Sequence, residues 1–193
     1  MPLFKKIKEN NCEISIWELS ETLDYLIKKY NFSEPNNITS KKRKKEILAS
    51  RLLLKNMYPD LKITYNKYGA PTVENNKFIS ISHSKKFVTI ILSHVRVGID
   101  IQEANNKALN IATKFIDLGT TKLISKNEAT LIWSCKECIY KWYQKGSVNF
   151  LNDIKVHSFK IREKGEITAN FKNQEFTLFY RKLKNHFLVY VCK

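Results

Sequence analysis

The spacing of apolar residues changes from a helical period to a strand period twice along the chain. Apolar positions recur at helical spacing over residues 20–27 and 40–58, and they then alternate with polar positions, as in β-strands, through the middle of the chain. The same order returns in the second half, with helical spacing over residues 105–116 and 125–145 and alternation over 154–192. We therefore predict two similarly built halves, each combining helices with a sheet.

Local signals predict the ends of the helices. Ser20 is the expected N-cap of the first helix, and Pro59 lies just beyond the second. Ser125 and Glu128 form an S-x-x-E capping box that begins a long helix, and Gly146 is its expected end. The expected strands are 12–17, 62–65, 71–73, 78–82, 87–93, 97–102, 154–162, 165–171, 175–181 and 187–192, with a loop at 33–40 and a turn at 66–69.

No long flexible linker separates the halves, although a boundary near residues 94–97 fits the pattern. The length of 193 residues suits one large domain or two small ones packed together. Hydrophobic residues make up 43% of the chain, so a packed core is expected rather than global disorder. The two halves are therefore expected to pack tightly against each other.

The chain is strongly basic, with 34 Lys and Arg residues against 18 Asp and Glu and a net charge of +16. Such a field attracts polyanions: nucleic acid, an acidic protein or a phosphate-rich small molecule. The N-terminus lacks the apolar stretch of a signal peptide, and no apolar run approaches the length of a membrane-spanning helix. We therefore expect a cytoplasmic protein without a membrane partner.

Cysteines stand at positions 12, 135, 138 and 192. Cys135 and Cys138 form a C-x-x-C pair, which is in general typical of metal or redox sites. Here the pair lies within a helical pattern, without a second C-x-x-C or a nearby pair of histidines to complete a tetrahedral site. Structural thiols are the favoured interpretation, and reduced cysteines fit the cytoplasm.

Asp100 lies between Ile99 and Ile101 in an apolar strand, so its side chain points to the opposite face from the two isoleucines. Gln102 shares the face of Asp100 and can supply a neutral oxygen. Burial of a carboxylate costs several kcal/mol unless it is paired or bound to a metal, which favours a functional role. An ordinary solvent-facing strand residue is the alternative.

Trp133, Glu137 and Lys141 are spaced four residues apart on the long helix and therefore line one stripe. Lys136 and Tyr140 are close by in sequence, so the charged residues occur among aromatic ones. This arrangement suits the edge of a cleft, although Glu137 and Lys141 could equally form a routine surface pair.

A hydroxyl–imidazole cluster and a basic run suit an anionic ligand. His83 lies between Ser82 and Ser84, where small donors beside an imidazole can bind phosphate; a strand-end histidine without a role is the alternative. The basic run of residues 41–45 begins the second helix, where cations oppose the helix dipole, and Arg51 follows it. A solvated face or a nucleic-acid patch would also explain the run, but no P-loop, dinucleotide-binding or RNA-binding signature is present.

Five segments, in order, resemble the motifs of 4′-phosphopantetheinyl transferases of the monomeric, surfactin-synthetase-activating type. The last of them, W-x-x-K-E-x-x-x-K, is the most diagnostic. The resemblance covers roughly half of the chain, from Lys42 to Lys141. The matching segments are Arg51-Leu52-Leu53-Leu54, Gly69-Ala70-Pro71, Ser82-His83-Ser84, Gly98-Ile99-Asp100-Ile101-Gln102 and Trp133 to Lys141.

This resemblance implies an enzyme that transfers 4′-phosphopantetheine from coenzyme A to a serine of an apo acyl or peptidyl carrier protein and releases 3′,5′-ADP. Asp100, Glu137 and Gln102 are the implied ligands of Mg²⁺, with Mn²⁺ as the alternative ion. Glu137 is also the implied base for the carrier serine and Lys141 the cation that stabilises phosphate charge, so both join Asp100 as expected catalytic residues. The implied coenzyme-binding residues are Arg51, Ser82, His83, Lys42, Arg43 and Lys136.

Three positions depart from the family pattern. Gln102 replaces the usual second acid, so the ion would be held by one charge fewer. Ala70 replaces a lysine, which removes one phosphate contact that Lys67 or the basic run of residues 41–45 could supply. The segment 116–122 lacks a glutamate often found there, which bears on carrier docking or a further metal contact.

The fold implied by the resemblance is an α/β protein of the α+β kind: a pseudo-twofold pair of similar subdomains, residues 1–96 and 97–193, each an antiparallel sheet with packed helices. Coenzyme A would bind in the cleft between them. The expected partner is an acidic carrier protein, with no nucleic acid and no membrane, and one chain with both halves is expected to be monomeric. A pseudo-enzyme that binds coenzyme A without transfer, motivated by Gln102 and Ala70, and a basic nucleic-acid-binding protein remain the alternatives.

Overall fold

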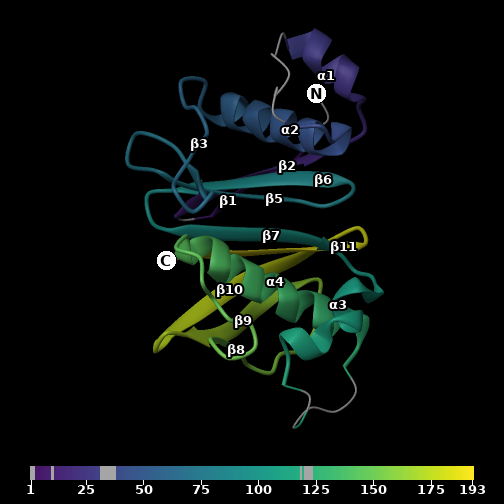
Figure 1. The fold of residues 1–193 in the computed structure, drawn as a ribbon, viewed down its shortest axis with the longest axis vertical. Coiled ribbons are helices and arrows are strands. Elements are labelled where there is room, and N and C mark those ends of the chain that lie inside the picture. Colours follow the sequence, from purple (N-terminus) through teal and green to yellow (C-terminus); the bar gives the residue numbers. More distant parts are fainter. Residues whose placement is uncertain (1–2, 10, 31–37, 118, 120–123) are drawn as a thin grey trace.

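The computed structural model describes residues 3–9, 11–30, 38–117, 119 and 124–193. Its layers follow the order helices, sheet, sheet, helix (Figure 1). The helices are α1 (Leu23–Tyr30), α2 (Lys41–Met57), α3 (Asn106–Asn110) and α4 (Lys126–Tyr143), with a 3₁₀ turn, η1, at Ala112–Lys114. The strands are β1 (Leu3–Glu9), β2 (Cys12–Glu18), β3 (Thr64–Tyr65), β4 (Pro71–Thr72), β5 (Phe78–His83), β6 (Phe87–Ser93), β7 (Val97–Glu103), β8 (Ile154–Val156), β9 (Lys164–Phe171), β10 (Gln174–Leu183) and β11 (His186–Cys192).

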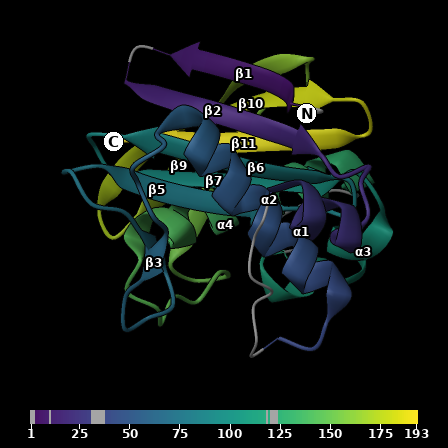
Figure 2. The same ribbon diagram turned by 90° about the horizontal axis from the view of Figure 1, so that it is seen from above.

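The two main sheets divide the chain between Ser93 and Val97. The first has the strand order β1-β2-β6-β5 and the second the order β7-β11-β10-β9-β8, with antiparallel pairing throughout. Strands β3 and β4 form a separate short hairpin. Helices α1 and α2 cover one face of the first sheet (Figure 2), and α4 packs on the second. The predicted fold class, α+β with antiparallel sheets and packed helices, is confirmed.

Among the described residues, three apolar clusters hold these layers together. One lies between the first sheet and helices α1 and α2, a second between the two sheets, and a third between α4 and the second sheet. Representative members are Leu26, Leu52 and Ile90 in the first, Ile14, Ile91 and Leu188 in the second, and Leu131, Ile139 and Phe176 in the third. Because the second cluster buries apolar side chains from both halves, it favours a fixed arrangement of one half on the other.

Strand β7 separates two environments by its alternating side chains. Ile99 and Ile101 point into the cluster between the sheets, so Gly98 and Asp100 face α4. A Cβ atom on Gly98 would lie 2.0 Å from the Cys138 backbone oxygen. Glycine at this position therefore allows α4 to approach the strand closely.

Serine hydroxyls join β5 to β7 at the seam between the halves. Ser80 Oγ accepts a hydrogen bond from the Ile99 backbone N–H at 3.2 Å, and Ser82 Oγ accepts one from the Ile101 N–H at 3.1 Å. These hydroxyls satisfy buried N–H groups that a paired strand would otherwise satisfy. The side chains of β5 therefore link the two strands, and a cleft opens along this seam.

Helix α4 begins as predicted. The Ser125 hydroxyl accepts a hydrogen bond from the Glu128 N–H at 3.2 Å, and the Glu128 carboxylate accepts one from the Ser125 N–H at 2.8 Å, which confirms the capping box. The predicted end at Gly146 is wrong, because Gln144 adopts a left-handed φ of 58° and closes the helix earlier. The sequence predicts the end at Gly146 because glycine adopts the left-handed conformation at the lowest energetic cost.

Two shorter helices also differ from the predictions. Thr22, rather than Ser20, caps α1, because its hydroxyl accepts a hydrogen bond from the Tyr25 N–H at 3.2 Å. The helix expected over 105–116 divides into α3 and η1, with Ile111 between them at a non-helical φ of −116°. None of the helices described is long and apolar enough to cross a membrane.

Two strands differ as well. Strand β1, which the sequence pattern does not predict, pairs with β2 at the edge of the first sheet. Its lysines obscure the strand period, since Ile7 is buried among exposed lysine side chains. The strand expected over 154–162 ends at Val156, and the loop expected over 33–40 is described only from residue 38.

Candidate active site

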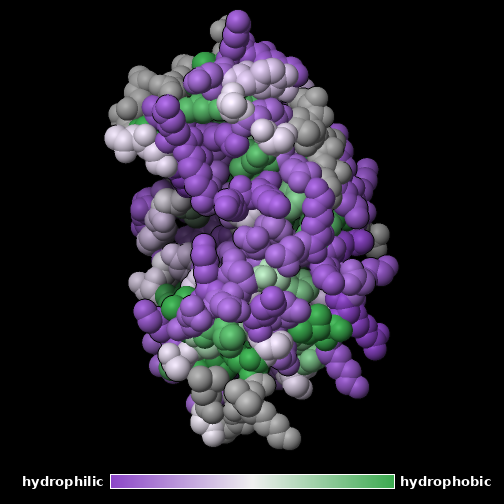
Figure 3. Space-filling view, turned by 90° about the vertical axis from the view of Figure 1, so that its right-hand side faces the viewer, coloured by the Kyte–Doolittle hydropathy of each residue, from purple (hydrophilic) through white to green (hydrophobic). Residues whose placement is uncertain are grey.

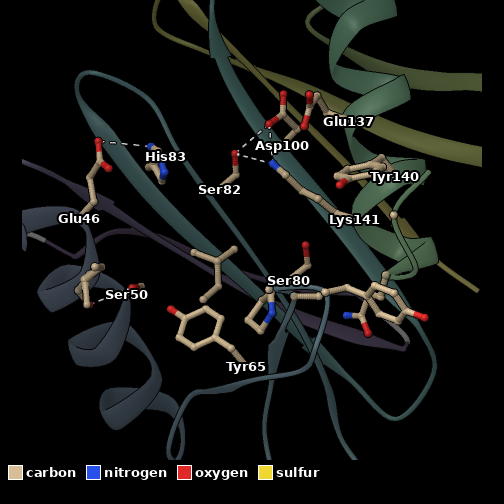
Figure 4. Close-up of a pocket in the computed structure, with 18 of the residues that line it drawn as sticks. Glu46, Ser50, Tyr65, Ser80, Ser82, His83, Asp100, Glu137, Tyr140 and Lys141 are labelled. Carbon is tan, nitrogen blue, oxygen red and sulfur yellow. Dashed lines mark hydrogen bonds and ion pairs between the residues drawn. The ribbon is translucent and has the colours of Figure 1, made fainter. Parts of the chain in front are cut away.

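A cleft of about 440 Å³ lies between the two halves. Helix α2, the β3–β4 hairpin and β5 line one side, and β7 and α4 line the other (Figure 4). Figure 3 shows a hollow at mid-height between the halves, bordered mainly by hydrophilic residues. The predicted site residues that line the cleft are Arg43, Ser82, His83, Asp100, Gln102, Glu137 and Lys141.

Asp100 is the most enclosed charge in the cleft, with 1% of its surface exposed. Its Oδ1 atom accepts hydrogen bonds from Ser82 Oγ and Lys141 Nζ, each at 2.8 Å (Figure 4). Its Oδ2 atom is buried and has no hydrogen-bond partner within the described residues. A buried carboxylate oxygen without a donor is costly, so Oδ2 is the atom placed to take a ligand.

Lys141 connects three elements of the cleft. From α4, its ammonium donates hydrogen bonds to Asp100 Oδ1 on β7, to Ser82 Oγ on β5 at 3.1 Å, and to the Ile99 backbone oxygen at 3.1 Å. Burial alone would lower the pKa of Lys141, but the charges of Asp100 and Glu137 outweigh it and raise that pKa. The side chain therefore stays protonated and can neutralise negative charge in the cleft.

Glu137 lies one helical turn before Lys141 on the same stripe of α4. Burial raises the pKa of the Glu137 carboxyl group; Lys141 opposes this rise and Asp100 adds to it. A carboxylate with a raised pKa is a better proton acceptor than an exposed one. Glu137 is therefore suited to accept a proton from a group that enters the cleft.

The acidic side of the cleft fits a hard divalent cation. Asp100 offers its unpaired Oδ2, Glu137 is near enough for the two charges to interact, and the Gln102 amide nitrogen lies 3.5 Å from Asp100 Oδ1. The described part of the chain has no group of three or more His, Cys, Asp or Glu side chains arranged to hold a metal. Two carboxylates suit Mg²⁺, which keeps waters and binds substrate phosphates, better than they suit a closed transition-metal site.

Arg43, Glu46 and His83 form a compact cluster at the α2 side of the cleft. Arg43 Nη1 lies 2.5 Å from His83 Nε2 and 3.3 Å from Glu46 Oε2, and His83 Nδ1 lies 3.3 Å from Glu46 Oε1. Burial is the main cause of a lowered pKa for His83; Glu46 opposes it, and Arg43, Lys141 and Lys42 add to it. His83 is therefore neutral near neutral pH, beside a permanently charged guanidinium.

Three predicted coenzyme-binding cations do not line this cleft. Lys42 is exposed on α2, 3.7 Å from Glu46, and lines an adjoining groove. Arg51 is half-buried on α2 but is not among the residues that line the cleft, where Arg43 and Ser50 occupy the helix face instead. Roles for Lys42 and Arg51 in coenzyme binding stay predictions.

Lys136, the third of these cations, is buried on a different side of α4 from Lys141. Its ammonium donates hydrogen bonds to the backbone oxygens of Phe150, at 2.5 Å, and Ile154. Burial lowers the pKa of Lys136 to about 8. The expectation that this lysine binds coenzyme does not fit its position, because its donors are used to hold the segment after α4.

Cys135 and Cys138 are fully buried in the cluster between α4 and the second sheet. Cys138 Sγ donates to the Val189 backbone oxygen at 3.0 Å. Burial raises the pKa of both thiols, so they are protonated and poorly nucleophilic. Their position is that of small packing residues of the helix–sheet interface.

Some cleft residues are missing from the predicted site. Glu46 is the acid that directly follows the basic run of residues 41–45, three positions after Arg43, and this spacing is the signal that would have found it. Ser80 is two residues before Ser82 and therefore shares its strand face. Tyr65 lines the cleft from the hairpin, and no motif marks it.

The positions that depart from the family pattern are only partly described. Ala70 lines the cleft, and Lys67 lies over the Tyr68 ring, 5.1 Å from its centre. The segment 116–122 falls largely outside the described residues, which stop at 117 and resume, apart from 119, at 124. Its effect on carrier docking stays a prediction.

Comparison with known proteins gives one clear similarity. No family model matches the chain. The chain is 26% identical to the L-aminoadipate-semialdehyde dehydrogenase-phosphopantetheinyl transferase of Candida glabrata, over 96% of this chain and 85% of that protein. The similarity spans both halves and does not distinguish the surfactin-synthetase-activating type from others. It supports the prediction, made from the five motifs, of a transferase enzyme of the phosphopantetheinyl transferase kind.

Proposed function

We propose that the protein transfers 4′-phosphopantetheine from coenzyme A to a serine of an apo carrier protein and releases 3′,5′-ADP. The observation that carries this proposal is the contact of Asp100, Ser82 and Lys141 in a cleft that also contains Glu137. Ser82 comes from the first half of the chain, and Asp100, Glu137 and Lys141 come from the second. Packing of the two halves does not require charged side chains at these positions. Their chemistry suits transfer of a phosphoryl group.

Asp100 and Glu137, with Gln102 in the third position, would hold Mg²⁺, or Mn²⁺ as the alternative. The ion would neutralise the pyrophosphate of coenzyme A and polarise its phosphorus–oxygen bonds. Lys141 adds a fixed positive charge beside the same phosphates. Asp100 keeps this ammonium oriented through their 2.8 Å contact.

In the proposed reaction, the hydroxyl oxygen of the carrier serine attacks the β-phosphorus of coenzyme A. Glu137 accepts the hydroxyl proton, a new serine–phosphorus ester forms, and the bond to the 3′,5′-ADP oxygen breaks. The buried position of Glu137 and its raised pKa support this role. Arg43, held against His83, meets a phosphate on the other side of the cleft, and the exposed ring of Tyr65 offers a stacking surface for adenine.

A groove beside the cleft suits the carrier protein. It shares His83, Gln102 and Trp133 with the cleft, so a partner seated there can reach the reacting groups. Basic groove residues include Lys41, Lys42, Lys45, Lys85 and Lys107. With the net charge of +16, this favours an acidic carrier. Since one chain supplies both sides of the cleft, we propose a monomer.

The direct test combines the protein with coenzyme A, Mg²⁺ and a panel of apo acyl and peptidyl carrier proteins. Each carrier is then weighed by mass spectrometry. The expected result is a gain of one phosphopantetheine on at least one carrier, lost when its acceptor serine is replaced by alanine. Coenzyme A binding without modification of any carrier would instead favour the pseudo-enzyme, which Gln102 and Ala70 motivate.

Gln102→Glu is expected to lower the Mg²⁺ concentration for half-maximal rate by about three- to tenfold, because it adds a charged oxygen ligand. The measurement is the transfer rate during a Mg²⁺ titration. Gln174→Glu, which adds the same charge at the exposed start of β10, is the matched control and should leave the titration unchanged. An unaltered metal dependence in Gln102→Glu would show that this side chain does not face the ion.

Lys41→Glu and Lys107→Glu are expected to raise the KM for the carrier about fivefold at low salt, because they reverse charges on the groove. The effect should fade as salt is added, while the KM for coenzyme A changes little. Lys155→Glu, at an exposed position on β8, is the control for a general loss of positive charge. Equal effects of Lys155→Glu and the groove variants would argue against a specific docking surface.

A further inference from the structure

Glu46 is a buried carboxylate that the proposed reaction does not use. It is 4% exposed, although it lies on α2 next to the most basic run of the chain. Its Oε1 atom is buried and has no hydrogen-bond partner among the described residues, so nearby positive groups compensate its charge. These groups are Arg43 at 3.3 Å and Lys42 at 3.7 Å. A carboxylate retained at such a cost indicates a specific role.

The contacts among Glu46, His83 and Arg43 fix one arrangement of hydrogen atoms. Arg43 Nη1 lies against His83 Nε2, and a guanidinium can only donate, so Nε2 is the acceptor. The proton of the neutral imidazole is then on Nδ1, the atom that faces Glu46 Oε1 at 3.3 Å. Arg43 therefore links His83 to Glu46 through one nitrogen, while the His83 ring packs against the other carboxylate oxygen of Glu46.

We propose that Glu46 is a positioning residue that, together with His83, holds Arg43 in the orientation in which its guanidinium meets a phosphate of coenzyme A. This inference rests on the proposed function. The side chain of Arg43 is 48% exposed, and both of its contacts in this cluster use Nη1. The guanidinium therefore presents further N–H donors toward the cleft while Glu46 restrains it from behind.

The negative charge of Glu46 would by itself repel a phosphate. A phosphate bound to the outer donors of Arg43 lies nearer to the guanidinium than to the carboxylate behind it, and Coulomb energy falls with distance. The attraction of a held guanidinium therefore exceeds the repulsion of Glu46. Holding Arg43 in place also favours binding, because the Arg43 side chain then loses less conformational entropy when the phosphate binds.

Glu46→Gln tests the idea, because it removes the charge and keeps the shape. The KM for coenzyme A should rise about tenfold, the scale of losing a charge-assisted contact, while kcat changes less than about twofold. Direct calorimetric titration with coenzyme A, without carrier, should show the same weakening. Glu13→Gln is the matched control: Glu13 accepts a hydrogen bond from the Tyr58 hydroxyl, away from the cleft, and the variant should bind normally.

A double-mutant cycle separates positioning from general effects. If Glu46 acts through Arg43, then Glu46→Gln should weaken binding much less in an Arg43→Ala background than in the wild type. Equal weakening in both backgrounds overturns the proposal. Tighter coenzyme binding by Glu46→Gln also overturns it, since repulsion would then dominate.

The nitrogen NMR signals of His83 give a readout that does not need coenzyme. In the ligand-free wild type, Nδ1 should carry the proton and Nε2 should not. In Glu46→Gln, Arg43 is no longer held against Nε2, so the proton should be shared between the two nitrogens. Unchanged His83 signals in Glu46→Gln overturn the positioning role. Failure of the wild type to bind coenzyme A would contradict the proposed function. The His83 signals are measured without coenzyme, so they test the positioning role independently of that outcome.

Discussion

Asp100→Asn is expected to lower the transfer rate at least about 100-fold, the scale of losing a catalytic charged group. Asparagine keeps the size of the side chain, but it removes the charge from the buried Oδ2 atom that is placed to take the cation. It also removes the counter-charge of Lys141, whose contact with Asp100 is 2.8 Å. Glu137→Gln should cause a loss of the same order, because it removes the proton acceptor. The measurement is kcat/KM from the rate of carrier modification.

The fold should survive these substitutions. The Lys141 ammonium keeps its hydrogen bonds to Ser82 Oγ and the Ile99 backbone oxygen when Asp100 loses its charge. Circular dichroism and thermal melting of each variant verify this, and Asp60→Asn, at an exposed turn, is the control for an aspartate-to-asparagine change. A folded Asp100→Asn variant with a rate near that of the wild type would remove Asp100 from the catalytic site.

Gly98→Val is expected to be the most destabilising single change in the cleft region. The first added atom would lie 2.0 Å from the Cys138 backbone oxygen and 3.1 Å from the Trp142 backbone nitrogen, neither of which can rotate away. Helix α4 must therefore move off β7, at a cost of about 3 kcal/mol or more in the free energy of unfolding. Denaturant titration measures this loss.

The same displacement should impair activity beyond the loss of folded protein. Glu137 directly precedes Cys138, and Lys141 directly precedes Trp142, so both catalytic side chains move with the part of α4 that Gly98 contacts. Activity per folded molecule should fall at least about tenfold, as for a misplaced catalytic group. Gly119→Ala is the control, because the nearest described atom to its Cβ would be the end of the Asp117 side chain, at 3.2 Å. Wild-type stability of Gly98→Val would mean that α4 does not pack this closely on β7.

Short-range patterns in the sequence determined much of the fold. The period of two in residues 97–102 places Asp100 opposite Ile99 and Ile101, and the capping box starts α4 at the right residue. Both depend on the geometry of a single element, so neighbouring residues contain the information. The same reasoning could have set Lys136 apart from Lys141, since five residues along a helix turn the side chain by about 140°.

The composition of the site depended on the tertiary structure. Whether Arg43 or Arg51 faces the cleft is decided by how α2 lies over β5, and Glu46 becomes important only because His83 arrives from a distant strand. Strand β1 exists because β2 offers it an edge, despite a weak apolar pattern of its own. The amino-acid sequence thus determined which face each element presents. Tertiary packing decided which of these side chains meet. The two halves pack together through the cluster between the sheets, and Gly98 lets α4 approach β7. Both depend on contacts between residues far apart in the chain.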